Sequence, residues 1–600
     1  MESGITRRQA VGVAGIALVA GGALAQPGRQ DAAALRTLLQ ASADADERRL
    51  PLSAAPRAIP FVDPLSDAYA SALSADQRRN LAGLASIRRD ALSVGDRIAY
   101  DVLGYQARQT IASFESGVFE TARRAPLDPS FGLHVEMADF VSGAAPFATI
   151  ADYEAGLRRL DGFAGYMHSV VDRLKEGLAN GQVQPAIIVA NVLAEVDAML
   201  ALPIEDSPFY TAIKAAPPTI DASAHRRLAA AYRQLIAMRV YPAYRLWKEF
   251  LTDTYAPRAG TAPGRWAMKG GDALYAAELE RHTTTTMTAD ALHDLGVAEV
   301  TRIRQEMEAA RVATGFTGDL KAFFNYIRVD KRFYCKTPEE LLARFAAIEA
   351  RIWKSIPKLF SRRPKAPFSV QALPVLGAQR GTGYYRPGPP DGKTPGVLYF
   401  NMAMLGTRPI PTLETLTLHE GIPGHHFQIT LARENDKLPP LLRLHGDEHF
   451  TAFTEGWGLY AESLGRDLGM FEDPYQWFGH LDMEMLRAVR LVVDTGLHAQ
   501  RWDRQRAIDY MLTNTSMAQH DVEVEIDRYI AAPGQACAYK TGELRFQALR
   551  AKAEKGLGSA YTIRDFHDQV LGTGALPLQV LEAKIDHWIA AGGGSDGSGF

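Results

Sequence analysis

Two histidines and a glutamate in the stretch HEGIPGHH, residues 419 to 426, are the residue types of a hydrolytic zinc site. In the regular helical motif of zinc peptidases, the second histidine follows the first by four positions, and the glutamate beside the first acts as general base. Here that position holds Pro423, and histidines follow His419 by six and seven positions. On an undistorted helix, His425 would point away from His419, and His426 would lie about 10 Å further along the axis.

A local bulge around Pro423 would resolve this spacing. Proline removes a backbone donor and disturbs the preceding turn, and the two neighbouring glycines can adopt dihedral angles that other residues avoid. Two residues could loop out and return His425 to the place of a regular i+4 histidine, as helix bulges do at functional sites. We therefore predict His419 and His425 as zinc ligands, Glu420 as general base and His426 as the alternative second ligand.

A third ligand is predicted on the next helix. A catalytic zinc ion needs three protein ligands and one open position for water. The segment FTAFTEGWGLYAESLG, residues 450 to 465, places Glu455 and Glu462 seven positions apart on one face of an apolar helix. Carboxylates are rarely buried without a partner. We therefore predict Glu455 as the third ligand of a Zn²⁺ ion.

The segment HGDEH, residues 445 to 449, is a competing zinc motif. It fits the inverted pattern H-x-x-E-H, with histidines at regular i and i+4 spacing. Its surroundings contain a glycine that weakens a helix, and this favours the motif at His419. A further alternative gives all of these histidines structural roles.

Residues further along the chain could stabilise the transition state or bind substrate. In RAVRLVVDTGLHAQ, Arg490, Asp494 and His498 recur every four positions, so they share one helix face. Asp494 could pair with Arg490 there, whereas His498 is a candidate donor to the oxyanion. Tyr539 of PGQACAYKTG is a second candidate donor. The residues predicted to bind substrate are Arg490, Arg528 and Lys540.

Five segments carry a resemblance to a known family: LTLHEGIPGHHFQ, TEGWGLYAE, RLVVDTGLHAQRW, DRYIAAPGQACAYKTGELRFQALR and FHDQVLGTGALPLQVLE. Over nearly all of the chain after residue 25, the sequence resembles a bacterial family known as domain of unknown function 885. That family is similar to the gluzincin metallopeptidases, whose ligands are two helix histidines and a downstream glutamate. The resemblance implies the same ligand set, His419, His425 and Glu455, and a peptidase activity.

The first 25 residues resemble an export signal. Arg7 and Arg8 precede a short apolar run, and Ala23-Leu24-Ala25 offers a small-residue cleavage site. The arginine pair is typical of twin-arginine signals. We predict a periplasmic or secreted protein, with a single membrane anchor as the alternative. No later segment reaches the ~18 apolar residues of a spanning helix, so we expect no stable membrane insertion after cleavage.

The composition is that of a globular protein, with 47% hydrophobic and 22% charged residues among 600. A formal net charge of -3 argues against nucleic-acid binding, which requires a basic face. The expected partner is a peptide or another amide substrate. Cys335 and Cys537 could form one disulfide bond. Two buried free thiols are favoured, because a protein with so large a core does not need a disulfide for stability.

The hydrophobic pattern predicts a mainly α, large helical two-lobed fold with a small β-sheet beside the active-site cleft, and the family resemblance implies that this fold is zincin-like. Apolar residues at three- and four-residue spacing predict an N-terminal helical lobe over 26–260 and a catalytic lobe over 261–591, followed by a flexible tail, 592–600. The segment 397–402 predicts a strand. We expect it to form the edge of the sheet, where an extended peptide could add as another strand.

Together these features predict a secreted or periplasmic zinc metallopeptidase that hydrolyses short peptides with a glutamate general base. One alternative is a zinc amidohydrolase that acts on a non-peptide amide. The other is a catalytically inactive protein that binds peptides.

Overall fold

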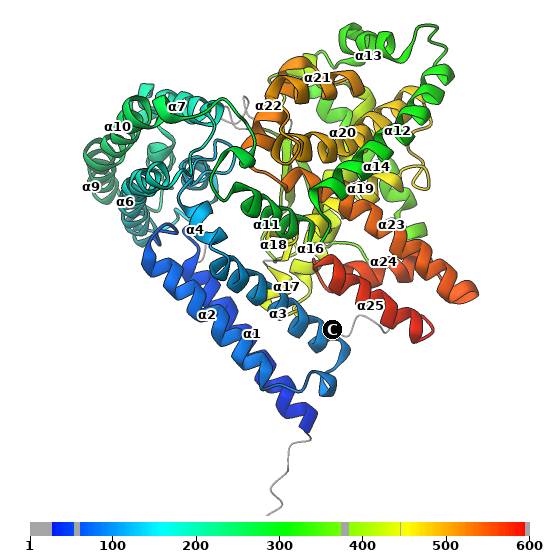
Figure 1. Cartoon of the computed structure of the whole chain (residues 1–600), viewed down its shortest axis with the longest axis horizontal. Coiled ribbons are helices and arrows are strands. Elements are labelled where there is room, and N and C mark those ends of the chain that lie inside the picture. The colour runs from blue at the N-terminus through cyan, green and yellow to red at the C-terminus, as the bar shows by residue number, and fades with distance from the viewer. Residues whose placement is uncertain (1–26, 53–60, 374–382, 445, 595–600) are drawn as a thin grey trace, which may run out of the picture.

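The computed structural model describes residues 27–52, 61–373, 383–444 and 446–594 (Figure 1). The predicted export signal and the end of the predicted tail lie outside these residues. Helices dominate the described chain, and the only sheet described has three strands. None of the described helices has both the length and the apolar character needed to cross a membrane.

The helices before the sheet are α1 Pro27–Arg49, α2 Asp67–Ala85, α3 Val94–Glu115, α4 Val118–Arg123, α5 Leu133–Asp139, α6 Ile150–Asn180, α7 Ala186–Ala201, α8 Thr211–Lys214, α9 Ala222–Leu235, α10 Tyr241–Phe250, α11 Gly271–Thr283, α12 Ala289–Ala313, α13 Leu320–Val329 and α14 Pro338–Leu359. Local sequence signals set their ends. Thr149 and Asp152 form a reciprocal capping box at the start of α6, and this helix stops before Gly181, whose φ of 78° suits glycine.

The helices after the sheet are α15 Leu413–Leu416, α16 His425–Glu434, α17 Pro440–Arg443, α18 Gly446–His449, α19 Thr451–Ser463, α20 Pro474–His498, α21 Arg504–Asn514, α22 Gln519–Ala531, α23 Ala538–Leu557, α24 Ile563–Leu571 and α25 Leu578–Ala590. A π turn, η13, covers Thr417–Gly421. The long helix α20 starts at Pro474 behind an Asp473 cap and is buried along most of its length. It therefore serves as a central support for the elements around it.

The sheet contains β1 Phe368–Ala372, β2 Gly383–Arg386 and β3 Gly396–Phe400 in the order β1-β3-β2. β1 runs parallel to β3, with Phe368 opposite Gly396, and β2 runs antiparallel to it. The strand predicted at 397–402 is therefore present as β3, but its predicted edge position is wrong because it has a partner on each side. The edges belong to β1 and β2.

Two large hydrophobic cores give the molecule two lobes. The first surrounds Phe163 of α6 and Trp247 of α10 and also includes Val489 of α20. The second surrounds Trp457 of α19 and includes Leu35 of α1. Figure 1 shows α6, α7, α9 and α10 gathered on one side and the C-terminal helices on the other. The mainly α, two-lobed prediction is confirmed. Because both cores combine residues from either side of position 260, the boundary there stays a prediction.

The two cysteines are both buried and unpaired. Cys335 packs in the second large core, and Cys537 packs in a smaller cluster with Tyr275. Two free buried thiols, the favoured interpretation of the sequence, are thus what the structure contains.

Candidate metal centre

The chain breaks between the two predicted histidine ligands. α15 runs directly into the π turn η13, and Ile422 then leaves the helix with φ −119° and ψ 118° before α16 begins at His425. The Ile422–Pro423 peptide bond is cis. The predicted local bulge is therefore a break between two helices, and it brings the ring centroids of His419 and His425 to 4.6 Å.

Gly424 makes this break sterically feasible. A Cβ atom there would lie 1.8 Å from the carbonyl oxygen of His419 and 2.4 Å from that of Leu418. Both contacts are with backbone atoms, which cannot rotate away as a flexible side chain could. Only glycine fits this close approach.

Gly424→Ala should therefore destabilise the protein by about 3 kcal/mol or more, as severe overpacking does, and it should reduce metal binding. Thermal unfolding together with metal analysis would measure both effects. Gly165→Ala on α6 is the matched control, because a Cβ there meets nothing within 4 Å. It should keep or slightly raise stability. Equal behaviour of the two variants would contradict the steric argument.

Three side-chain atoms from three elements converge on one point. Oε2 of Glu455 on α19 lies 3.3 Å from Nε2 of His419 and 3.4 Å from Nε2 of His425. Tetrahedral Zn²⁺ with bonds of about 2.0–2.1 Å places neighbouring ligand atoms about 3.3–3.4 Å apart. Oε2 of Glu455 is also buried and has no other hydrogen-bond partner among the described residues. The three residues therefore fit a zinc ion.

The local charges favour a cation at this point. Burial works against a charged His419, but the carboxylates of Glu455 and Glu462 raise the pKa of its imidazole to about 9. Burial would likewise raise the pKa of Glu455, yet His425 and His419 hold it well below the ordinary value. Each group thus stabilises the opposite charge beside it. A divalent cation would satisfy all of them at once.

Glu462 orients His419 from behind. Nδ1 of His419 lies 2.7 Å from Oε1 of Glu462, and Arg487 donates to the same oxygen at 3.2 Å. A carboxylate on one imidazole nitrogen leaves the lone pair of the other nitrogen for a metal. Gly458 leaves room for the ring, because a Cβ there would lie 2.5 Å from Cε1 of His419.

The sequence alone predicts no role for Glu462. The one indication of such a role is its spacing of seven residues from Glu455, which places both side chains on one helix face. Arg487 could not be found from sequence, because it belongs to a different helix, α20.

Glu462→Gln should weaken zinc binding about 10- to 100-fold, the usual cost of losing an outer-shell partner. Competition with a chelator would measure this loss. Glu308→Gln is the control, because Glu308 pairs with Arg311 on the solvent side of α12. Zinc affinity that is unchanged in Glu462→Gln would rule out the orienting role.

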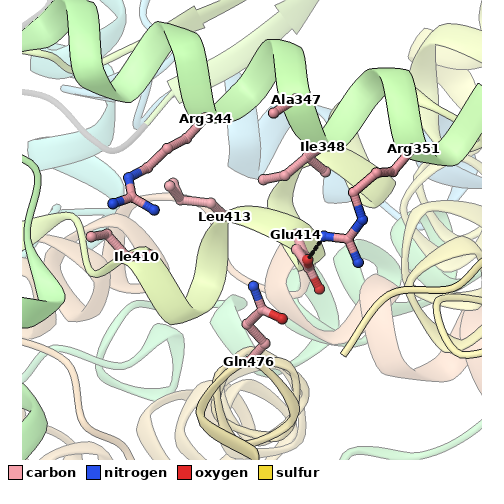
Figure 2. A pocket seen from close by; sticks show the side chains of 8 residues that line it. All are labelled: Arg344, Ala347, Ile348, Arg351, Ile410, Leu413, Glu414 and Gln476. Carbon is pink, nitrogen blue, oxygen red and sulfur yellow. Dashed lines mark hydrogen bonds and ion pairs between the residues drawn. The ribbon is translucent and has the colours of Figure 1, made fainter. Parts of the chain in front are cut away.

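The helix segment before His419 is tied to its neighbours at Glu414. Figure 2 shows Arg351 of α14 reaching Glu414 of α15 at the wall of a small cavity, about 160 Å³ in volume. Nη1 of Arg351 lies 2.7 Å from Oε1 of Glu414, whose Oε2 accepts the backbone N–H of Phe471 at 2.7 Å. These contacts fix α15 and, through it, the turn that carries His419.

The metal-ligand candidates open into a cavity of about 550 Å³. Glu420 lies beside His419 and His425. One ligand atom from each of these three residues lies within 4.8 Å of the other two. Phe131, from the connection between α4 and α5, lines the cavity and is half exposed. The strand β2 contributes Tyr384 and Tyr385 to the wall. The site is thus open to a ligand of moderate size.

Comparison with known proteins identifies the family of the chain. A family model described as "Bacterial protein of unknown function (DUF885)" matches residues 61–585. The chain belongs to this family. No curated protein matches.

Two solved structures share the fold of this DUF885 family member. A putative lipoprotein from Colwellia psychrerythraea has a TM-score of 0.84 and 26% identity, with 94% of this chain and all of that chain covered. A putative lipoprotein of unknown function from Shewanella oneidensis has a TM-score of 0.66 and 15% identity, with 93% and 98% covered. A putative oligoendopeptidase F from Bacillus anthracis str. Ames has 10% identity and a TM-score of only 0.29, which is too low to indicate a shared fold.

Three further predicted residues of the DUF885 chain lie in the cavity wall: Tyr539, Arg490 and Arg528. The Tyr539 hydroxyl accepts a long hydrogen bond of 3.4 Å from Gln535. Burial and the nearby charge of Glu455 raise the pKa of Tyr539. The phenol therefore stays protonated at neutral pH and can donate a hydrogen bond into the cavity.

The structure does not support the predicted oxyanion role of His498. The backbone N–H of Arg265 donates to its Nδ1 at 3.1 Å, and its Nε2 lies 3.0 Å from the carbonyl oxygen of Tyr529. Both ring nitrogens are thus occupied, and the side chain is fully buried away from the cavity lining. Asp494 does not pair with Arg490 either, but accepts from Tyr275 at 2.6 Å and from the backbone of Gly534.

The structure also does not support the predicted substrate-binding role of Lys540. Its ammonium group lies 2.6 Å from Glu484, 2.8 Å from Glu543 and 3.2 Å from Glu299, and the side chain has no exposed surface. A lysine enclosed by three carboxylates holds helices together and cannot reach a ligand.

His426 faces the sheet instead of the metal centre. Its Nε2 lies 3.1 Å from the carbonyl oxygen of Ala366, and its Nδ1 lies 2.9 Å from the hydroxyl of Tyr385. Burial lowers the pKa of His426 to about 4. The geometry therefore favours His425 over His426 as the candidate second ligand. In the competing motif, His445 and the side chain of Glu448 lie outside the described residues.

Proposed function

We propose that this chain is a zinc-dependent metallopeptidase that acts on short peptides. The observation that carries the proposal is the convergence of His419, His425 and Glu455, at 3.3 and 3.4 Å, on a point that opens into a cavity. Two histidines and one carboxylate leave the fourth position of a zinc ion open, as catalytic sites require.

The side chains around this point have complementary chemical roles. A zinc ion held there would supply Lewis acidity and lower the pKa of a water molecule. The Glu420 carboxylate takes a proton from the attacking water and returns it to the leaving amine. The Tyr539 hydroxyl donates a hydrogen bond to the oxygen that becomes negatively charged. The Glu462 carboxylate keeps His419 in the required tautomer.

The cavity wall suits a peptide. β2 is an edge strand, and its residues Gly383, Tyr384 and Tyr385 line the cavity. An extended peptide can add to such an edge through backbone hydrogen bonds, while its side chains enter neighbouring pockets. Apolar side chains from other elements provide the pocket surface, namely Phe400, Met404, Leu416, Ile429, Met483, Leu486 and Met517.

We further propose that the protein is exported to the periplasm or beyond the cell. The support is the arginine-containing signal pattern of residues 1 to 25. The similar structures from Colwellia psychrerythraea and Shewanella oneidensis are described as putative lipoproteins, a class that is also exported. Separate analysis of membrane, periplasmic and culture fractions would test this location.

A peptide-library digest with and without chelator tests the function. The purified chain should hold about one zinc per molecule, cleave library peptides, lose this activity with chelator and regain it with zinc. Folded protein without divalent metal, and without a response to added zinc, would refute the proposal. Zinc binding with cleavage of only non-peptide amides would point to an amidohydrolase, and peptide binding without cleavage would point to an inactive binder.

A further inference from the structure

Two arginines in the cavity wall share a single carboxylate. Arg490 of α20 and Arg528 of α22 donate to Oε2 of Glu525 at 2.9 and 3.0 Å. The Tyr529 hydroxyl donates to the same oxygen. Burial disfavours a charged Glu525, but Arg528 and Arg490 lower its pKa, so the carboxylate is ionised. Two positive charges therefore face one negative charge.

The other arginines that line the cavity are occupied differently. Arg408 has its own carboxylate, Asp521, at 3.1 Å, and Arg487 pairs with Glu462 at 3.2 Å. Arg328 donates to the backbone carbonyl groups of residues 512, 515, 516 and 517. Among the lining residues that the structure describes, Arg490 and Arg528 are the two arginines that share one carboxylate, Glu525.

Aromatic rings hold these two guanidinium groups in place. The Arg490 guanidinium lies 4.4 Å from the centre of the Tyr539 ring, and that of Arg528 lies 4.8 Å from the centre of the Tyr529 ring. Arg528 also donates to Gln535 at 2.7 Å. The hydrogen bonds of Arg490 to described residues use its Nε, bound to Tyr529, and its Nη2, bound to Glu525, which leaves Nη1 as the donor for a ligand. A preorganised guanidinium loses little entropy when it binds a planar anion.

The pair lines the same cavity as the metal-ligand candidates, and Tyr539 belongs to the same lining. This tyrosine packs against Arg490, and its hydroxyl group is influenced by the charge of Glu455. We propose that Arg490 and Arg528 bind the free C-terminal carboxylate of a peptide, which makes the chain an exopeptidase that acts near the C-terminus. This inference rests on the proposed peptidase function and specifies its substrate class.

A terminal carboxylate fits this subsite better than an internal peptide segment does. Planar carboxylates form paired, charge-assisted hydrogen bonds with guanidinium groups. A cavity of about 550 Å³ holds a short piece of peptide, so a chain end is a natural occupant. In the reaction, water adds its hydroxyl group to the scissile carbonyl carbon and a proton to the amine. The two arginines exchange no proton and only position the chain end.

Binding of matched peptides to the zinc-loaded full chain tests the inference without requiring turnover. The probes are acetylated tripeptides of the form X-Ala-Ala, with either a free C-terminal carboxylate or a carboxamide, and the Glu420→Gln variant prevents cleavage. Calorimetry should show about 10- to 100-fold tighter binding of the free acids, as expected for charged hydrogen bonds. Equal affinities, or no binding of either series, would overturn the inference.

Arginine variants assign the preference to the subsite. In the Glu420→Gln background, Arg528→Gln and Arg490→Gln should bring the acid-to-amide ratio close to one. Arg528→Lys keeps the charge without the planar fork and should lose most of the preference. Arg344→Gln is the control, because Arg344 lines the separate small cavity of Figure 2, and it should retain the full ratio. A full ratio in both Gln variants would overturn the assignment.

One further probe distinguishes a C-terminal carboxylate from the carboxylate of an acidic side chain. A carboxamide peptide with glutamate as its last residue should bind as weakly as the other amides. If it binds as tightly as the free acids, the subsite accepts an acidic side chain and the exopeptidase assignment is wrong. Selective binding of free acids by a chain that cleaves no peptide would support the subsite and refute the peptidase function instead.

Discussion

Glu420→Gln should lower peptide turnover about 100- to 10,000-fold, the usual contribution of a general base, while the chain keeps its zinc. The glutamine has nearly the same shape as glutamate but cannot accept the proton from water. Steady-state kinetics and metal analysis on the same preparation would measure both quantities. Glu308→Gln on the exposed side of α12 should match the wild type.

The combination of retained zinc and lost turnover is the informative result. If Glu420→Gln lost zinc instead, Glu420 would be a ligand and not a base. Because Glu420 lies beside His419 and His425, it is close enough to act either as a metal ligand or as a general base, and this variant distinguishes the two roles. If the variant kept near-full turnover, another group would have to take the proton.

The neighbouring variants His425→Ala and His426→Ala should have opposite effects. Loss of His425 removes one of three convergent ligand atoms, so zinc affinity should fall by more than the about 100-fold that an outer-shell loss costs. Loss of His426 removes contacts to Ala366 and Tyr385 and should lower thermal stability with little effect on zinc affinity. Chelator competition and thermal unfolding, measured on both variants, would separate the two effects.

Glu455→Ala should behave like His425→Ala, because it removes another of the convergent atoms. Zinc loss in His426→Ala without zinc loss in His425→Ala would reverse the assignment. It would also mean that His426 leaves its position behind the sheet when the metal binds.

The metal-ligand candidates could be predicted because the relevant information is local. Pro423 and its neighbouring glycines predict a break in the helix, and the break decides which histidine returns to His419. The face of α19 that carries Glu455 follows from helical periodicity alone. The helical character of most elements could be predicted for the same reason, because cap residues and the spacing of apolar residues are properties of short sequence segments.

The incorrect predictions all depended on what lies opposite a residue. Periodicity places His498 on the same face of α20 as Arg490, but α20 is buried nearly all round, and one face meets different surroundings along its length. The cavity lies at Arg490, whereas Arg265 and Tyr529 cover His498. Likewise, the carboxylates around Lys540 come in part from α12 and α20.

Strand order is non-local in the same way. The segment at 397–402 has clear strand character, but its edge or central position depends on pairing with β1 and β2. The register of β1 and β2 against β3 cannot be determined from their sequences alone, because the pairing depends on packing against the helices behind the sheet.

The limited volume of the cavity has a consequence for the cell. At about 550 Å³, it is the size of a site for a small molecule, so an intact folded protein, including another copy of this chain, cannot enter it. The peptidase proposed above would therefore spare folded neighbours without an inhibitory pro-segment. That peptidase would depend on other proteases to release fragments first, and it would act late in the breakdown of a protein.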